Sequence, residues 1–573
     1  MNLSFRVRVI ILTFSSWISN PHPLFAQSTP PSGVTIPPNT PGKVEQTIPQ
    51  PTPSPTFSTP PSPSNPILSP NPIDNPLDTT FSTGESFFVK EIQIIGNTVL
   101  KEEITKLKQP LENKNIRFEQ LLELRSQITQ LYIKEGYITS GAFLLNNQNL
   151  NSGIIKIQIV EGELEAIELS GLQRLQKGYV RSRIARATQT PLNQKRLEQA
   201  LQLLQIDPLI ARVNAELTAG STPGSNILRL QLKEAPAFHA GMEVANSQSP
   251  SIGSEQGSVF IEHENLLGLG DKFYAEYGIT KGLNLYDISY NVPFNALNGT
   301  IGVRYNNSDS KIIEDDFRDL DIRSESRTLS FNVRQPLQRT PESEFALGLA
   351  FDLRRSQTFL LDDIPFSFSE GPEEGESKIT AIRFSQDWLQ RDADRVLAAR
   401  SQFSIGINAF DATVNVTGTD GQFFTWLGQF QWVQKLSPRV IILAKIDAQL
   451  TGDSLLSLEK FSIGGVETVR GYNQNQVVTD NGIIASVEAR IPLISNTNTL
   501  QLVPFFDFGT GWNNRVSNPS PQTLTSLGLG LRWQPFQGLN LRADYAIPLF
   551  GVDNKGDSLQ DNGFNFSLRY QPF

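Results

Sequence analysis

The chain has 573 residues, a net charge of −9 and no cysteine. The length allows several domains, and the acidic balance argues against a nucleic-acid-binding protein, which needs basic stripes. A chain without cysteine cannot use disulfides, thiolate catalysis or cysteine-ligated metals, and it suits an oxidising compartment.

The first 26 residues are predicted to be an export signal. Arg6 and Arg8 precede a short apolar run at 9–18, and Ala26 is followed by Gln27 at a fair cleavage position. The apolar run is too short to span a bilayer. The remaining chain has no run of 18 apolar residues, so a role inside a membrane would need a closed β-barrel.

Residues 27–85 are dominated by Pro, Ser, Thr and Asn, and they lack the apolar periodicity that buries a core. Such a composition predicts a disordered linker, extended and in part polyproline II. Two interpretations of the linker stay open. It is either a spacer, or a segment that crosses a cell-wall layer or threads a pore.

Residues 86–236 contain two successive copies of an α/β pattern, at 86–162 and 163–236. Each copy opens with a strand ending in a glycine turn, at Gly96 and at Gly171. Each closes with an alternating strand, around Ile157 and around Leu230. Between these strands, apolar residues at helical spacing predict packed helices: Phe118, Leu121, Leu122, Ile128, Leu131 and Tyr132 in the first copy, and Leu197, Ala200, Leu201 and Leu204 in the second. Helices on a small sheet form an α+β layer arrangement.

From residue 237 to residue 573 the period of the pattern changes to two. Large apolar residues such as Phe345, Leu347 and Leu349 alternate with small or polar ones. Alternation alone also fits a soluble sandwich. The number of candidate strands, sixteen, and the arginines in the polar rows favour a transmembrane barrel with a wet interior. The fold class is therefore expected to be mainly β, with a 16-stranded transmembrane β-barrel after two α+β modules.

The strand count places strand eleven at 439–451, strand twelve at 482–494 and strand thirteen at 500–512. The long connection at 457–482 carries Val469, Arg470, Gly471 and Tyr472. By alternation, strand thirteen directs Phe505, Asp507 and Gly509 to the lumen, and Leu502, Phe506 and Phe508 to lipid. Glu488 and Arg490 on strand twelve also face inward.

These features, in this order, resemble the outer-membrane transporters of two-partner secretion, the TpsB proteins of the haemolysin and filamentous-haemagglutinin secretion family. The resemblance covers about residues 86–573. It identifies the two α/β copies as polypeptide-transport-associated (POTRA) domains, through three cues: Gly96-Asn97, Gly136-Tyr137 and Val160-Glu161-Gly162. One departure is that Gln571-Pro572-Phe573 puts the terminal phenylalanine out of step with the apolar row of the last strand.

The resemblance implies that the connection folds into the lumen and that Arg470 contacts Asp507 there. Gly471 would allow a tight turn and Tyr472 would pack beside it. It further implies a barrel, expected to be monomeric, in outer-membrane lipid, with the POTRA domains in the periplasm. These domains would bind a secreted TpsA-like exoprotein, since an edge strand can add an extended client by backbone hydrogen bonding. The exoprotein would then pass to the cell surface with no bond made or broken.

Three other functions are alternatives to transport. A barrel-assembly insertase of the same superfamily has the same loop pair but usually more POTRA copies. A passive porin lacks POTRA modules and the loop motif. An enzyme would need paired carboxylates or a nucleophile with its base, and none are clustered here. His22, His239 and His263 have no third ligand near them in sequence, so no catalytic residue, metal or cofactor is expected.

Overall fold

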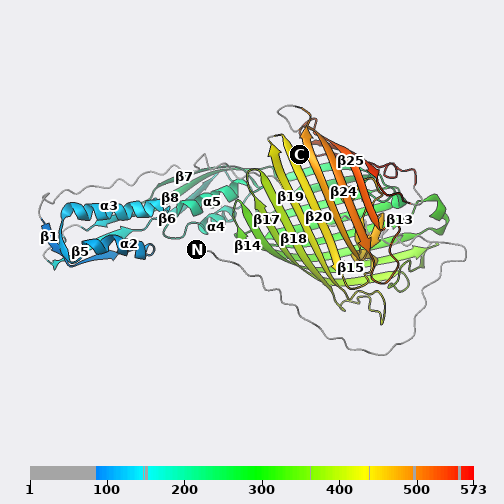
Figure 1. Ribbon diagram of the computed structural model, residues 1–573, viewed down its shortest axis with the longest axis horizontal. Coiled ribbons are helices and arrows are strands. Elements are labelled where there is room, and N and C mark those ends of the chain that lie inside the picture. Colours follow the sequence, from blue (N-terminus) through cyan, green and yellow to red (C-terminus); the bar gives the residue numbers. More distant parts are fainter. Residues whose placement is uncertain are drawn as a thin grey trace.

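The computed structural model describes residues 86–572, except for 146, 147, 149–151, 362, 438, 495–498 and 553–555. The predicted signal peptide, the Pro-rich segment and Phe573 lie outside the described residues. The described chain forms two α/β units that extend away from one end of a barrel (Figure 1). Among the helices in the described ranges, none combines the length and apolar character needed to cross a bilayer.

The first α/β unit packs two helices against a three-stranded sheet of order β2-β5-β4. Strands β2 and β5 are parallel, and β4 is antiparallel to β5. Its core holds Ile92, Ile104 and Ile157, all fully buried. The elements are β1 (Ser86–Val89), β2 (Glu91–Ile95), α2 (Lys101–Lys108), η1 (Gln109–Leu111), β3 (Lys114–Arg117), α3 (Phe118–Lys134), β4 (Gly141–Leu144) and β5 (Ile154–Val160).

Local sequence signals set both ends of α3. At its start, the Gln120 side chain accepts a hydrogen bond from the Arg117 amide at 3.0 Å, which satisfies a free N-terminal donor. At its end, Gly136 takes a φ of +87°, a conformation that favours glycine. The predicted apolar face of this helix is confirmed for Leu121, Ile128 and Tyr132, which are buried. It is wrong at one position, since Leu124 and not Leu122 lies in the core.

Glu161, in the predicted exit motif, ties the end of the first unit back to its beginning. Its carboxylate accepts hydrogen bonds from the Thr98 amide at 2.7 Å and the Tyr132 hydroxyl at 2.9 Å. Burial opposes ionisation of this carboxyl, but the hydrogen bonds from Thr98, Tyr132 and Val99 outweigh it and lower its pKa. The charged form therefore stabilises the folded unit.

The second α/β unit repeats this architecture with a sheet of order β6-β8-β7. Strands β6 and β8 are parallel, and β7 is antiparallel to β8. Leu197, Leu201 and Leu204 of the predicted helical face are buried. The elements are β6 (Glu163–Ser170), α4 (Lys177–Ala185), α5 (Gln194–Gln205), β7 (Ile210–Ala219) and β8 (Ser225–Glu234).

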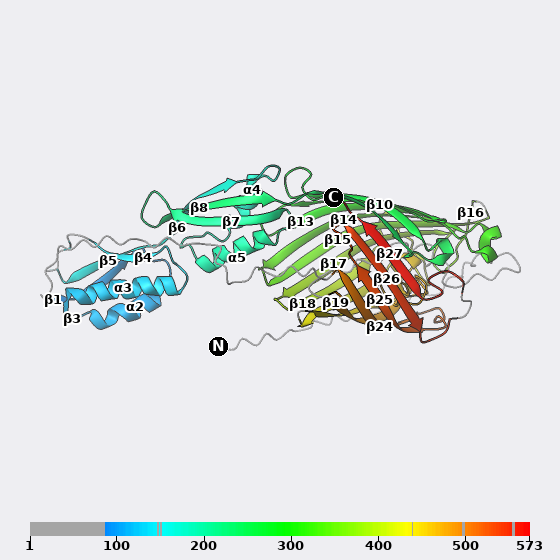
Figure 2. The ribbon, with the colours of Figure 1, turned by 90° about the horizontal axis from the view of Figure 1, so that it is seen from above.

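The second unit is docked on the barrel end through the connection between β10 and β11. The Gln176 amide donates to the Gly268 carbonyl at 2.8 Å, and the Arg174 guanidinium donates to His263 Nε2 at 2.9 Å. A Cβ added at Gly270 would lie 2.4 Å from the Tyr179 ring, so glycine permits this close approach. Figure 2 shows both units reaching away from this end of the barrel.

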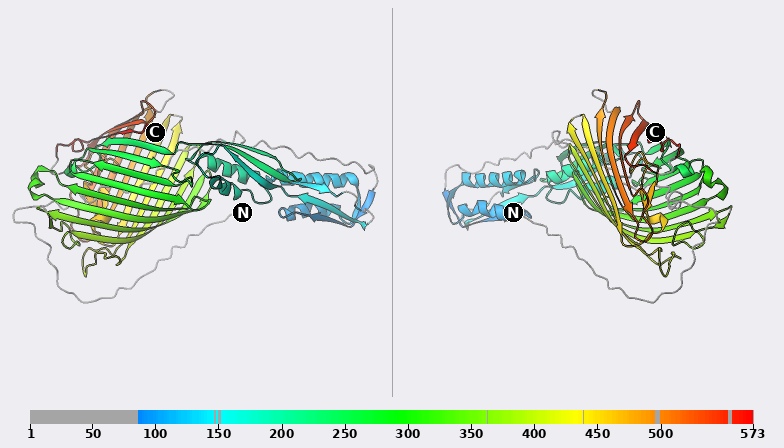
Figure 3. Two further views of the ribbon diagram at one scale, coloured as in Figure 1. Left: turned by 180° about the vertical axis from the view of Figure 1, so that it is seen from behind. Right: turned by 45° about the vertical axis from the view of Figure 1, so that its right-hand side comes forward.

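Within the described residues, sixteen strands close into an antiparallel barrel, seen from two more sides in Figure 3. The first and last strands pair from Ser567↔Ala245 to Tyr570↔Met242. Closure leaves no sheet edge to be satisfied in lipid. The strands are β9 (Phe238–Ala245), β10 (Gln256–His263), β11 (Lys272–Ile279), β12 (Leu283–Pro293), β13 (Thr300–Lys311), β14 (Arg323–Arg339), β15 (Ser343–Leu360), β17 (Glu376–Arg391), β18 (Arg395–Gly406), β19 (Phe424–Ser437), β20 (Val440–Thr451), β23 (Asn481–Pro492), β24 (Leu500–Trp512), β25 (Thr523–Trp533), β26 (Leu539–Pro548) and β27 (Phe564–Tyr570).

Among the described residues, three short elements lie in connections between barrel strands outside the long loop described below: η3 (Pro250–Ile252), η4 (Asp315–Leu320) and β16 (Ile364–Pro365). The large apolar residues of the barrel face outward, as the alternation predicts. Phe331 is 49% exposed and Leu349 is 54% exposed. Their inward neighbours, such as Ala346 and Asp352, are buried. The predicted strands eleven, twelve and thirteen correspond to β20, β23 and β24, within two residues at every end.

Candidate functional site

The connection between β20 and β23 turns back into the barrel. It contains η5 (Ser457–Glu459), β21 (Phe461–Ile463) and β22 (Val477–Thr479), and the two strands pair as an antiparallel hairpin. The hairpin contacts the inner wall at β24. Its apolar side chains form a buried cluster with wall residues: Leu427, Phe461, Ile463, Val469, Tyr472, Val477, Ile484 and Leu524.

Arg470 lies in this hairpin and binds Asp507 on β24, as the resemblance implies. Arg470 Nε lies 2.7 Å from Asp507 Oδ2, and Nη2 lies 2.9 Å from Oδ1. The Arg470 backbone amide also donates to Oδ2, at 3.1 Å. This two-pronged contact is the strongest geometry for an arginine and a carboxylate. Both side chains are almost fully shielded, with Arg470 4% exposed and Asp507 fully buried.

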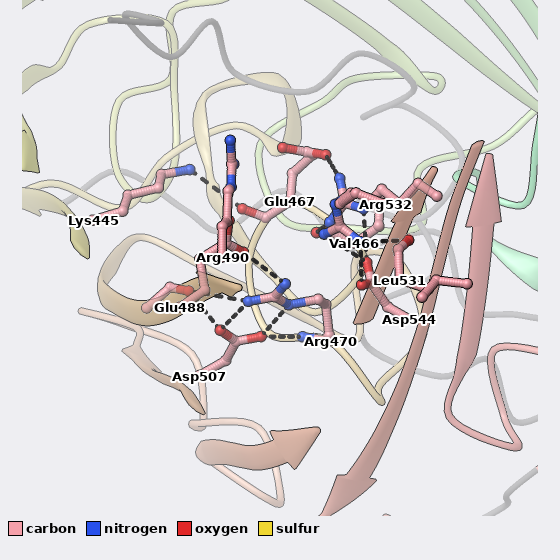
Figure 4. A network of polar contacts seen from close by, with 12 residues as sticks. Lys445, Val466, Glu467, Arg470, Glu488, Arg490, Asp507, Leu531, Arg532 and Asp544 are labelled. Carbon is pink, nitrogen blue, oxygen red and sulfur yellow. Dashed lines mark hydrogen bonds and ion pairs between the residues drawn. The ribbon is translucent and has the colours of Figure 1, made fainter. Parts of the chain in front are cut away.

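The wall adds contacts to Arg470 that the sequence did not predict. Arg470 Nη1 donates to Glu488 Oε2 at 3.1 Å, and Ser486 Oγ donates to Asp507 Oδ1 at 2.6 Å. The guanidinium also stacks on the Phe505 ring, 3.4 Å from its centroid. Register explains the grouping, because Ser486 on β23 is the direct partner of Asp507 and Glu488 that of Phe505. Figure 4 shows Arg470 between Asp507 and Glu488.

Gly509 makes room for the hairpin on the same wall. A Cβ at this position would lie 2.5 Å from Ile463 Cγ2 and 2.9 Å from Val469 Cγ2. Any larger residue would push the hairpin away from β24. All three lumen-wall residues thus hold the hairpin against β24. Phe505 stacks on the guanidinium, Asp507 binds it, and Gly509 leaves room for Val469.

Gly471 and Tyr472 fix the turn after Arg470. Gly471 has a φ of +88°, and a Cβ there would lie 2.9 Å from the Cβ of Ala546 on β26. The Tyr472 ring is buried, and its hydroxyl accepts a hydrogen bond from the Phe550 amide at 3.2 Å. Because the turn needs both a left-handed conformation and a close approach, it favours glycine.

Comparison with known proteins identifies the family. The model of the haemolysin secretion/activation protein ShlB/FhaC/HecB matches residues 224–533, more than half of the 573 residues. The chain belongs to this family. The model of the ShlB-type POTRA domain matches residues 87–162. Members of the family are two-partner secretion transporters, so this chain lies in the outer membrane with its POTRA domains in the periplasm.

Individual relatives agree with this assignment. The outer membrane transporter CdiB of Dickeya dadantii (strain 3937) is 22% identical over 495 residues, covering 82% of this chain and 84% of the relative. The heme/hemopexin transporter protein HuxB of Haemophilus influenzae is 22% identical over 510 residues, covering 85% and 88%. Among solved structures, CdiB from Escherichia coli has a TM-score of 0.66 and 22% identity, covering 87% of this chain and 94% of that one.

In this transporter the tip of the hairpin makes a further set of charged contacts (Figure 4). Arg542 on β26 donates to Glu467 Oε1 at 2.9 Å and to the Val466 carbonyl at 3.1 Å. Asp544 holds Arg542 from behind, with an Nε to Oδ2 distance of 2.7 Å. Lys445 on β20 donates to the Glu467 carbonyl at 3.2 Å. The alternation of the sequence does not pair Arg542 or Asp544 with the loop.

The hairpin occupies part of the lumen, and ion pairs such as Arg470–Asp507 and Arg542–Glu467 fasten it to the wall. The apolar cluster packs the hairpin against the wall, and ion pairs and hydrogen bonds add directional contacts to it. Beyond the hairpin, a cavity of about 440 Å³ is lined mainly by polar and charged side chains of β13–β19.

Proposed function

We propose that this transporter recognises a secreted partner protein through its POTRA domains and passes it through the barrel to the cell surface. The observation that carries the proposal is the hairpin seated in the lumen and held by Arg470 and Asp507. Charged contacts are directional and can be exchanged for contacts with water. A hairpin held in this way can leave the lumen without unfolding the barrel.

The partner protein would bind first to an edge strand of the POTRA sheets. In the first sheet the edges are β2 and β4. At β2, the Glu112 carboxylate accepts from the Ile92 amide at 2.8 Å, and Lys108 Nζ donates to the Ile92 carbonyl at 2.8 Å. These side chains occupy the backbone groups that a client would use. At β4 the Ala142 amide likewise donates to Thr129 Oγ1, at 3.1 Å, so client binding by strand addition is assigned to the POTRA sheet edges as a group.

Passage then requires the hairpin to move. The cavity of about 440 Å³ is pocket-sized by general standards, and a polypeptide needs a continuous path along the barrel. An extended client that folds after exit would bias its own movement outward. This activity makes and breaks no covalent bond, so the protein is proposed to act as a transporter and not as an enzyme or passive porin.

Co-expression with a two-partner exoprotein whose gene lies next to this one tests the proposal. Arg470→Ala is expected to abolish export of the exoprotein into the medium, because the hairpin then has no fixed closed position from which the client can release it. Arg490→Ala is the matched control, since the side-chain hydrogen bond and ion pair of Arg490 among the described residues go to the same Glu488. Heat-modifiable gel mobility verifies that both variants form barrels. Export by Arg470→Ala at the normal level would contradict the proposal.

A barrel-assembly insertase is a second candidate, and one observation favours it. The seam between β27 and β9 has four paired residues, whereas β14 and β15 pair over their whole length. A short seam is the easiest place for a barrel to open sideways. Depletion of the protein separates the two functions: loss of one exoprotein from the medium supports secretion, and a general loss of folded outer-membrane barrels supports insertion.

A further inference from the structure

The root of the hairpin carries a second charged contact, well separated from Arg470. Glu459 ends η5 and is 6% exposed. Its Oε1 atom lies 2.7 Å from Arg383 Nη2 and 2.8 Å from Arg354 Nη1, and its Oε2 atom lies 3.0 Å from Arg383 Nη1. Two guanidinium groups from the wall therefore enclose one carboxylate from the loop.

The two arginines come from neighbouring strands, Arg354 from β15 and Arg383 from β17. In the ring, β18, β19 and β20 lie between them and the β23–β24 wall that binds Arg470. The polarity is also reversed. At the root an anion of the loop binds cations of the wall, and at Arg470 a cation of the loop binds anions of the wall. The hairpin therefore reaches from one part of the wall to another, with a charged contact at each.

The side chain of Arg354 points its hydrogen bonds at the loop root. Its hydrogen bonds among the described residues go to the Leu458 carbonyl and to Glu459, both in the loop root. Arg383 is supported from the wall by Asp352, at 2.5 Å from Nε. The lumen cavity is lined by both arginines and by Glu459. This contact thus borders the space that a moving chain would enter.

We propose that Glu459, Arg354 and Arg383 form a second fastening of the hairpin, independent of Arg470 and Asp507, and that both fastenings release before a chain passes. This inference rests on the proposed withdrawal of the hairpin. Glu459 acts as a positioning residue, because it holds the loop root against the wall and has no contact with the Arg470 pair.

Channel recordings in planar bilayers test the fastening without any exoprotein. Glu459→Gln removes the charge and keeps the shape, so the fraction of time in the open state should rise about tenfold, the value of one charge-assisted hydrogen bond. Glu344→Gln is the matched control, since Glu344 binds wall arginines only. If the fastenings are independent, Glu459→Gln combined with Arg470→Ala should show the product of the two single effects. The proposal is overturned if Glu459→Gln behaves like the control, or if the double variant opens no more than either single variant.

A reversible cross-link tests the need for release. Ser457 Oγ in the loop root lies 3.5 Å from Ser369 Oγ, in the connection between β16 and β17, and the chain has no cysteine of its own. In Ser369→Cys/Ser457→Cys, oxidation should join the two thiols, and gel mobility reports the bond. Export should stop when the bond forms and return with reductant, while each single cysteine variant exports in both conditions.

Normal export with the bond formed would overturn the inference. If the unmodified protein exports no partner, the proposed function fails, whereas the bilayer recordings still decide whether Glu459 fastens the loop.

Discussion

The first POTRA domain and the barrel lumen differ in the polarity of their interiors. In the POTRA domain the interior is apolar, with Ile92, Ile128 and Ile157 fully buried. In the barrel the large apolar side chains lie outside, and the interior contains Arg470, Asp507 and other charged groups in contact with one another.

The surrounding solvent determines which face of each element is apolar, since both regions keep apolar surface away from water. A domain in water does so by turning apolar side chains inward. A barrel in lipid turns them outward, which leaves polar groups for the interior. Charged contacts then become available for holding a movable element, because they can be replaced by water or by a passing chain. Four predictions test this contrast.

The largest effect is expected from breaking the charged interior. Asp507→Asn leaves the Arg470 guanidinium with a weaker partner in a buried site, where losing one member of an ion pair costs about 3–5 kcal/mol. Urea unfolding in phospholipid vesicles measures the loss of barrel stability. Asp309→Asn on β13, at an exposed position, serves as the control and should leave the free energy of unfolding unchanged. Equal stability of the two variants would contradict the role assigned to Asp507.

A somewhat smaller effect is expected in the apolar interior. Ile157→Ala should lower the stability of the first POTRA domain by about 3 kcal/mol, through lost burial and a residual cavity. Hydrogen exchange of the β5 amides in the full-length protein measures this change, and the barrel amides should not respond. Lys156→Ala on the exposed face of the same strand should have little effect. Faster hydrogen exchange of the barrel amides together with those of β5 would show that the two regions are not independent in stability.

The inside-out pattern itself can be tested on two adjacent residues of β14. Phe331→Arg places a charge in lipid and should lower barrel stability by about 2–3 kcal/mol. Asn332→Arg places the same charge beside the lumen cavity, which Asn332 lines, and should change stability little. Folding yields into vesicles compare the two variants. A larger loss of stability for Asn332→Arg would contradict the assignment of Phe331 to the lipid side and Asn332 to the lumen side of β14.

The smallest effect concerns pH and the POTRA domain alone. Hydrogen bonds lower the pKa of Glu161 in the folded domain below its ordinary value of 4.5. A lowered pKa stabilises the fold above the unfolded pKa, and this contribution is lost as the pH falls through the folded pKa. Hydrogen exchange of α3 should therefore show less protection below about pH 4.5. The Glu161→Gln domain should be less stable than the natural domain at pH 7, and its stability should fall less on acidification.

The sequence by itself determined the strands and their facing, because a period of two is a local property that each strand carries on its own. For this reason β24 could be assigned from 500–512 with Asp507 inward. The contact between Arg470 and Asp507 came from a resemblance, since nothing local in the chain fixes where a long loop goes.

Only the tertiary structure decided which charges meet the loop. Glu488 joins Arg470 because the register of β23 with β24 puts it opposite Phe505. Glu459 meets Arg354 and Arg383 because barrel closure brings β15 and β17 to the loop root, over 75 residues away in the chain. Distances of this kind depend on the circumference of the closed ring and on the path of the loop across it, and no periodicity in the sequence records either of them.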